Sequence, residues 1–318
     1  MSSHHPPLSR PPAEIRTTGA IIVALAAISS SAPLIAFAAA PALAIAFWRN
    51  ALAVGVLGPL AVARRRAEFR SLVSSHRRQV RYSLLAGVAL AVHFAAWTPS
   101  VRMTTVAAAT ALVATQPIWQ GLIAVAQGQR LPSFTWIGIA VAVVGAVLAT
   151  GADFGVSGQA VLGDLLAVIG GIAGAVYTAF GERVRATIST TTYTTICYGA
   201  CAVLLLVVCL VGGLPLTGFD TATWLAILGL VAGAQLLGHS MFSYVLRRIS
   251  ATTVSVLILL EAPGAALIAW VWLGQAPRTV ALPGLALLLA GVAVAVLGNA
   301  RLGRRSLPAP PEAGPLPS

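Results

Sequence analysis

The residues best suited to chemistry in this chain are two opposite charges that stand inside long apolar runs. Glu261 lies near the middle of an apolar run from 251 to 273 that contains no other charge. Arg49 lies in a second run, from 41 to 63, and is the only other full charge deep within such a run. A carboxylate and a guanidinium can pair with each other, or each can bind the opposite end of a zwitterionic ligand.

Two histidines, His93 and His239, form a second candidate pair. Imidazole changes its charge near physiological pH, so the two side chains are suited to a proton relay or to hydrogen bonding with a ligand. Hydrogen bonding between helices is an equally weighted alternative.

Two prolines, Pro117 and Pro263, stand within apolar runs, where each removes a backbone hydrogen bond. The carbonyls freed in this way would serve a binding site, and a kink without a binding role is the equal alternative. Gln116, beside Pro117, and Trp97 complete the candidate binding residues; packing is the alternative for Trp97.

The elements that position these residues are predicted to be membrane-spanning helices. The 318 residues are 58% hydrophobic and 9% charged, with a mean hydropathy of +0.89, which lies outside the range of soluble proteins. A helix of about 20 apolar residues spans a bilayer, and the apolar runs do not alternate as the strands of a barrel would. We therefore predict an all-α integral membrane protein with ten transmembrane helices, at 17–38, 41–63, 82–101, 104–127, 134–151, 161–181, 189–212, 222–246, 250–274 and 278–299.

The net charge of +12 comes from 20 Arg residues and no Lys, and it follows the topology rather than a nucleic-acid-binding surface. With the N-terminus inside, 17 Arg residues lie on the cytoplasmic side and two, Arg102 and Arg278, lie outside. We expect a protein of the cytoplasmic membrane with both termini in the cytoplasm, including tails at 1–16 and 300–318. No nucleic-acid partner is expected. Cys197, Cys201 and Cys209 lack metal-ligand spacing, and neither a metal nor a cofactor is expected.

The chain contains an internal repeat. An offset of 146 residues superimposes matching residues, listed here by their first copies: Gly87, His93, Arg102, Pro117, the pair Gly128-Gln129, Gly138 and Gly145. We predict two five-helix repeats, at 17–151 and 161–299. Five is odd, so the second copy is expected to be inverted relative to the first, an arrangement typical of secondary transporters.

The same segments resemble a known family. The first half contains FWRNALA (47–53), HFAAWTPSVRMTTVAAATALVATQP (93–117) and GQRL (128–131), and the second contains GHSMFSYVLRRISATTVSVLILLEAP (238–263) and LGQAP (273–277). Together they resemble the two EamA-type repeats of the drug/metabolite transporter superfamily, over residues 17–299. Family members commonly have Gly-Glu where this chain has Gly-Gln at Gln129 and Gln275, so no ion-coupling role is expected for those positions.

The resemblance implies transport, often export, of amino acids, related metabolites or drugs, and it allows a homodimer through the last helices of each repeat. We expect a secondary active exporter of amino acids or related small polar metabolites, in which Arg49 and Glu261 line a central cavity. A structural ion pair between them is the alternative, and proton coupling through Glu261 is a further hypothesis. Efflux of drug-like or lipid-like cargo, or a channel or receptor, are the other functions considered. No enzyme motif or P-loop is present.

Overall fold

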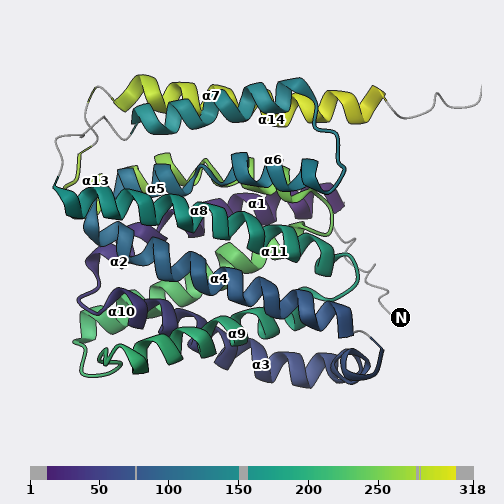
Figure 1. Ribbon diagram of the computed structural model, residues 1–318, viewed down its shortest axis with the longest axis vertical. Coiled ribbons are helices and arrows are strands. Elements are labelled where there is room, and N and C mark those ends of the chain that lie inside the picture. Colours follow the sequence, from purple (N-terminus) through teal and green to yellow (C-terminus); the bar gives the residue numbers. More distant parts are fainter. Residues whose placement is uncertain (1–12, 76, 150–156, 277–278, 280, 306–318) are drawn as a thin grey trace, which may run out of the picture.

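The computed structural model describes residues 13–75, 77–149, 157–276, 279 and 281–305, and within them every regular element is helical (Figure 1). The first half contains α1 (Ala13–Ser29), α2 (Ser31–Phe37), α3 (Ala42–Ser75), α4 (Arg77–Met103), α5 (Val106–Val113), α6 (Gln116–Ala126) and α7 (Ser133–Ala149). The second half contains α8 (Gly158–Arg185), α9 (Thr190–Val211), α10 (Thr221–Leu230), the π-helix η1 (Val231–His239), α11 (Ser240–Val245), α12 (Ala251–Ile258), α13 (Glu261–Leu273) and α14 (Ala281–Arg305).

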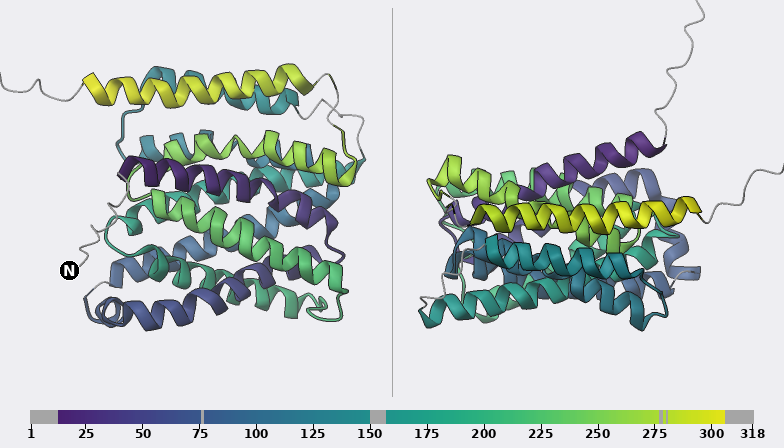
Figure 2. Two further views of the ribbon diagram at one scale, coloured as in Figure 1. Left: turned by 180° about the vertical axis from the view of Figure 1, so that it is seen from behind. Right: turned by 90° about the horizontal axis from the view of Figure 1, so that it is seen from above.

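Eight of the described helical segments are long and apolar enough to cross a membrane. Two shorter apolar helices, Ser133–Leu148 and Leu282–Val296, occupy the places of the fifth and tenth predicted spans. The beginning of α1 and the end of α14 lie at the same end of the bundle (Figure 2). The protein is therefore an all-helical, multi-pass membrane protein.

The second predicted helix is followed by a helical extension that was not predicted. The prediction placed its end at 63, close to a kink at Arg65, after which α3 continues as a second helical stretch to Ser75. Arg, Ala and Glu are strong helix formers and favour this second stretch outside the apolar layer. The backbone departs from helical values at Arg65 (φ −131°, ψ 23°). The last part of α3 consequently turns away from the bundle axis, and Figure 1 shows it nearly end-on.

Two of the spanning segments are interrupted near their centres. One break separates α5 from α6, and the other separates α12 from α13. At both breaks the backbone forms bonds three residues apart instead of four, for example from Thr115 N to Leu112 O (3.1 Å) and from Ala262 N to Leu259 O (3.2 Å). Pro117 and Pro263 lie in the first turn of the following helix, where an amide hydrogen would have no helical partner. The breaks therefore precede the prolines.

Equivalent helices of the two repeats pack antiparallel. α7 and α14 lie side by side as a layer at one edge of the bundle (Figures 1 and 2). Gly138 faces Ala295 while Gly145 faces Leu288, so the partner numbers fall as the first numbers rise. A methyl group at Gly145 would overlap the backbone of Leu288, so glycine permits this close approach.

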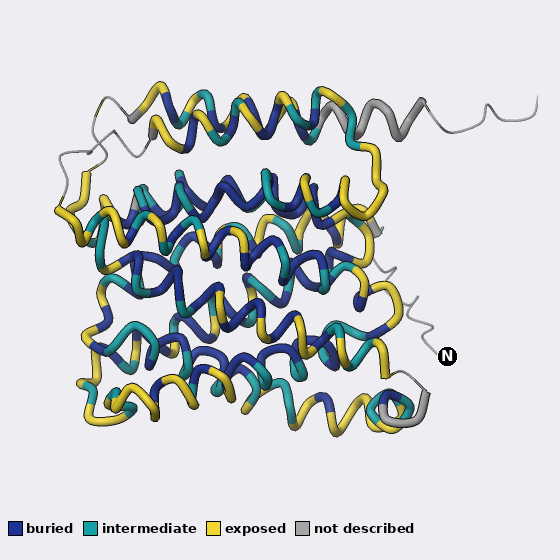
Figure 3. The backbone as a smooth tube through the Cα atoms, in the orientation of Figure 1, coloured by how far each residue is buried: buried dark blue, intermediate teal, exposed yellow. Residues whose placement is uncertain are grey.

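The remaining contacts repeat the same pattern. α5 packs against α13, and α6 packs against α12. The third segment of the first repeat, α4, packs against the first segment of the second repeat, α8. Correspondingly, the third segment of the second repeat, η1 and α11, packs against the first segment of the first repeat, α1. Figure 3 shows buried positions concentrated on the helices in the middle of the bundle, where the two repeats meet. The candidate residues of the sequence analysis therefore have to be located relative to this shared interior.

Carboxylates cap helix ends at both ends of the bundle. Glu182, near the end of α8, accepts a hydrogen bond from the backbone N–H of Ala251 at the start of α12 (3.1 Å). Asp220 accepts one from the backbone N–H of Thr223 in α10 (2.8 Å). Hydrogen bonding with the Thr223 hydroxyl, and then with this N–H, holds the pKa of the Asp220 carboxyl below its usual value. Anionic side chains stabilise helix N-termini because the amide groups there have no helical acceptors.

Candidate functional site

The central interior contains a cavity that both repeats line. The cavity is narrow, with a volume of about 40 Å³. Its walls come from the first, third and fourth spanning segments of the first repeat and from the equivalent three of the second. The lining residues are Ile28, Ser31, His93, Trp97, Val113 and Gln116 from the first repeat, and Gly174, Tyr177, Thr178, His239, Phe242, Ser243, Leu246, Val254, Ile258 and Glu261 from the second.

Glu261 is the only acidic residue among the described residues of this lining, and no Arg lines it. It begins α13, directly after the break in the ninth spanning segment. Its side chain is 5% exposed, and no hydrogen bond or ion pair joins it to any other described residue. A carboxylate in this position is available to a group that enters the cavity.

Arg49 lies behind the cavity wall rather than in it. It is fully buried on α3 and is absent from the lining. Its Nε donates to Oε1 of Gln235 (2.9 Å), its Nη1 donates to Oγ of Ser31 (3.3 Å), and its guanidinium carbon lies 4.2 Å from the centre of the Phe94 ring. Nη2 has no hydrogen-bond partner among the described residues. Arg49 and Glu261 are close enough for their charges to interact but do not form an ion pair. Ser31 separates the guanidinium from the cavity.

An amide network that the sequence analysis missed holds Arg49 in place. Gln235 receives the Arg49 hydrogen bond and donates from Nε2 to Oδ1 of Asn50 (3.1 Å), and Asn50 Nδ2 donates to the carbonyl of Ala46 (2.9 Å). Gln235 lies in the π-helix η1, an element found frequently at functional sites. The sequence signal was available, because both amides stand inside otherwise apolar runs.

The structure brings the two repeat-equivalent histidines together at the cavity. The ring centres of His93 and His239 lie 6.3 Å apart. Nδ1 of His93 lies 2.8 Å from the carbonyl of Gly170 and therefore donates to it, which ties α4 to α8. His239 packs edge-on against Phe94 (5.5 Å) and Tyr177 (6.1 Å). One histidine thus has a structural hydrogen bond, and both contribute to an aromatic wall.

Gln116 and Trp97 also line the cavity. Gln116 Nε2 donates to Oγ1 of Thr178 (3.1 Å), and the Trp97 ring stacks on His93 at 5.9 Å. The indole nitrogen of Trp97 has no partner among the described residues. Gly174 leaves room for these groups, because a Cβ there would lie 3.0 Å from Gln116 Oε1. Pro117 and Pro263 do not line the cavity.

Hydroxyl groups complete the site, and the sequence analysis singled out none of them. Tyr177 and Ser243 share a hydrogen bond (3.3 Å) across the two helices α8 and α11, and both line the cavity. Ser and Thr are common in transmembrane helices, so the sequence alone does not mark them as binding residues. Their position in the cavity depends on how these helices cross. Within the described residues no group of three or more His, Cys, Asp or Glu is placed to hold a metal ion.

The chemistry of the cavity follows from these contacts. A buried, unpartnered carboxylate attracts a cationic group, and Trp97, Tyr177 and Phe242 offer aromatic faces that also favour cations and apolar groups. The hydroxyl and amide groups can orient a polar ligand by hydrogen bonding. The site therefore suits a small organic molecule with a positively charged amine and an apolar part.

The architecture defines a class, that of multi-pass membrane proteins built from two repeats around a shared cavity. The sequence profile of the EamA-like transporter family matches residues 17–151 and 161–297, and the chain therefore belongs to this family. Its resemblance to the EamA-type repeats of the drug/metabolite transporter superfamily is confirmed.

A solved crystal structure has the same fold. It superimposes on this chain with a TM-score of 0.72 at 21% sequence identity, and the match covers 91% of this chain and 99% of the other. No curated protein matches the sequence.

Proposed function

We propose that this membrane transporter is a secondary active carrier of amine-bearing metabolites, with amino acids as the first candidates. The observation that carries the proposal is the unpartnered carboxylate of Glu261 in a cavity lined by equivalent helices of both repeats. In such an arrangement, rocking of one repeat against the other exposes the cavity to each side of the membrane in turn.

The proposal includes ten membrane-crossing helices, arranged as two inverted repeats in a cytoplasmic membrane. The antiparallel packing of equivalent helices supports the inversion. The concentration of arginines in alternate connections supports cytoplasmic termini. The two short apolar helices would complete the count as the fifth and tenth spans.

The amino-acid hypothesis assigns separate partners to the two charged groups of the cargo. The ammonium group would bind Glu261. The carboxylate would accept from Ser31, behind which the unpartnered Nη2 of Arg49 supplies a positive charge. Arg49 would thus act from behind the wall, and the predicted pairing of Arg49 with Glu261 in another state stays a prediction.

Proton coupling follows as part of the proposal, because a proton and an ammonium group would compete for the same carboxylate. Exchange of cytoplasmic cargo for an external proton would then give export. The outward direction rests on the family resemblance and is the part of the proposal that sidedness measurements have to test.

Amine-bearing drug-like or lipid-like compounds are the second candidate cargo. The observation in their favour is that no Arg is found among the described residues of the cavity lining, while Ile28, Val254 and Ile258 make much of its wall apolar. A cargo without a carboxylate would need no contribution from Arg49, which would keep its hydrogen bonds to Gln235 and Ser31.

A matched pair of compounds separates the two candidates. Leucine and 3-methylbutylamine share the ammonium group and the side chain and differ in the α-carboxylate. Uptake of both into liposomes containing the purified protein would be followed by mass spectrometry, with and without a pH gradient, against liposomes without protein. Transport of leucine supports the amino-acid hypothesis, and transport of the amine alone supports the second candidate. Uptake of no amine-bearing compound from a broad mixture would contradict both.

A further inference from the structure

A second hollow lies at the arginine-rich end of the bundle, away from the central cavity. It is lined by Arg65, Ala67, Glu68 and Ser71 of α3, by Thr187, Ile188 and Ser189 between α8 and α9, and by Arg247 between α11 and α12. The hollow is polar and open to its surroundings. The hollow therefore lies between α3 of the first repeat and two connections of the second repeat, α8–α9 and α11–α12.

Two arginines face this hollow from opposite repeats. Arg65 comes from the kink in α3, and Arg247 comes from the turn after α11. Neither has a hydrogen bond or an ion pair with another described residue. Arg185 lies nearby, almost fully buried, and donates to the carbonyls of Ser243 and Ile188. Arg247 repels Arg185, while Glu68 attracts both Arg185 and Arg65. Three arginines against one carboxylate leave the region with a net positive charge.

The acidic residue of the hollow, Glu68, is already held by hydrogen bonds within the protein. Glu68 accepts hydrogen bonds from the backbone N–H and the hydroxyl of Ser189 (both 2.6 Å) and from the hydroxyl of Thr192 (3.0 Å). These bonds fix the carboxylate on the N-terminus of α9. The carboxylate therefore supplies no close ion pair to Arg65 or Arg247, and the two guanidinium groups remain available to an external anion.

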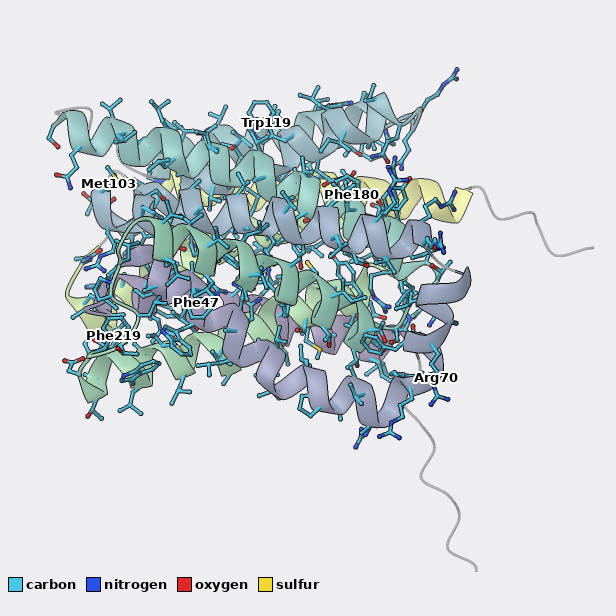
Figure 4. All side chains as sticks on the ribbon, turned by 60° about the horizontal axis from the view of Figure 1, so that its bottom comes forward. Phe47, Arg70, Met103, Trp119, Phe180 and Phe219 are labelled. Atoms are coloured by element: carbon cyan, nitrogen blue, oxygen red, sulfur yellow. The ribbon has the colours of Figure 1, made fainter. Side chains whose placement is uncertain are left out.

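The surroundings place this hollow where lipid headgroups would be. After the kink at Arg65, the end of α3 turns across the bundle (Figure 1). Leu72 on this segment is 3% exposed and packs into the core, whereas Arg70 points outward at the same end of the bundle as Phe180 (Figure 4). A helix with an apolar inner face and a basic outer face at the end of a membrane bundle is typical of the membrane surface.

We propose that this hollow binds the phosphate of an anionic phospholipid headgroup between Arg65 and Arg247. Guanidinium groups bind phosphate oxygens in a bidentate manner, and basic pockets between spanning helices recognise anionic headgroups. A phosphate there would bridge the two repeats at this end and favour the conformation in which they are close together. The inference does not rest on the cargo of the central cavity.

The test compares two pairs of arginines that carry the same charge. Wild-type protein, Arg65→Gln/Arg247→Gln and Arg64→Gln/Arg66→Gln would be purified in a neutral detergent and titrated with phosphatidylglycerol, phosphatidylcholine or inorganic phosphate. Bound lipid would be counted by native mass spectrometry. Arg64 and Arg66 are exposed and do not line the hollow, so the second double variant controls for net charge.

The expected result is one saturable phosphatidylglycerol site that weakens about 10-fold or more in the first double variant and is unchanged in the second. The single substitutions Arg65→Gln and Arg247→Gln should each weaken it, which covers the case in which the double variant does not fold. Equal weakening in both double variants, equal binding of phosphatidylcholine, or equally tight binding of inorganic phosphate would overturn the proposal.

Discussion

Replacement of Glu261 by Gln should leave the protein folded while it removes transport. The amide has nearly the same size as the carboxyl group, and the carboxylate forms no hydrogen bond or ion pair with other described residues. A charged residue at the centre of a membrane-spanning helix costs about 2.5–3.5 kcal/mol on insertion scales. Because Glu261 faces a cavity, this value is an upper limit on the stability that Glu261→Gln gains. Loss of the attraction between Glu261 and Arg49 offsets part of this gain, so the structure predicts an unfolding temperature close to that of the wild type.

A structural ion pair with Arg49 would give a different result. Removing one partner of a buried pair leaves the other charge uncompensated and costs about 3–5 kcal/mol. In the present structure Arg49 instead keeps its hydrogen bonds to Gln235 and Ser31 when Glu261 changes. The stability change thus distinguishes a carboxylate that is free to bind cargo from one that forms a structural ion pair with Arg49 between two helices.

The effect on cargo binding has its own magnitude. A hydrogen bond to a charged group contributes about 1.5–3 kcal/mol, so its loss should weaken binding of an amine-bearing cargo about 10- to 150-fold. Thermal unfolding in detergent and counterflow in liposomes measure the two effects on the same preparation. Glu14→Gln is the matched control, since Glu14 is exposed on α1 and outside the cavity. Wild-type counterflow by Glu261→Gln, or a lower unfolding temperature with normal counterflow, would refute the reasoning.

Three further predictions concern helix packing and helix ends. Gly145→Ala should lower stability by about 1–3 kcal/mol, because the added methyl group overlaps the facing helix α14, whereas Gly55→Ala, with open space around its Cβ, should be neutral or stabilising in thermal unfolding. Glu182→Ala should cost about 1–2 kcal/mol by removing the acceptor for the start of α12, and Glu182→Gln, which keeps an acceptor, should recover most of it in the same assay. Asp220 has a lowered pKa in the folded protein, so its stabilising contribution is present above about pH 4 and is lost as the pH falls through the folded pKa. Wild type and Asp220→Ala should therefore differ in unfolding temperature at about pH 6, and this difference should shrink as the pH is lowered below about 4.

The helices and the repeat were accessible from the sequence because both depend on local patterns. Apolar length predicts a spanning helix, and the shared offset that pairs His93 with His239 predicts equivalent positions. The extension of α3 beyond 63 and the positions of the helix breaks were not accessible. They depend on where Arg65 leaves the helix and on which backbone carbonyls neighbouring helices can satisfy.

The candidate site was accessible in part. Glu261, His93, His239, Gln116 and Trp97 were selected as polar or aromatic side chains in apolar runs, and all of them line the cavity. Whether any of them binds cargo stays a prediction.

Arg49 shows the limit of the same reasoning. The sequence placed Arg49 deep within an apolar run, but the direction in which its side chain points depends on helix rotation and packing. Ser31 and Gln235, which decide where the guanidinium lies, act through contacts between distant segments.

The central claim is that the cavity between the two repeats is the path of the cargo, and cysteine accessibility tests it most directly. Ile258→Cys would place a thiol in the cavity lining, and Leu267→Cys would place one on the exposed surface of α13, each after Cys197, Cys201 and Cys209 are replaced by Ala. A membrane-impermeant thiol reagent would be added from either side of reconstituted vesicles. The account predicts that Ile258→Cys reacts from both sides, that transported cargo slows this reaction, and that Leu267→Cys, which faces the lipid, stays unreactive. Reaction of Ile258→Cys at a rate that cargo does not change would contradict it.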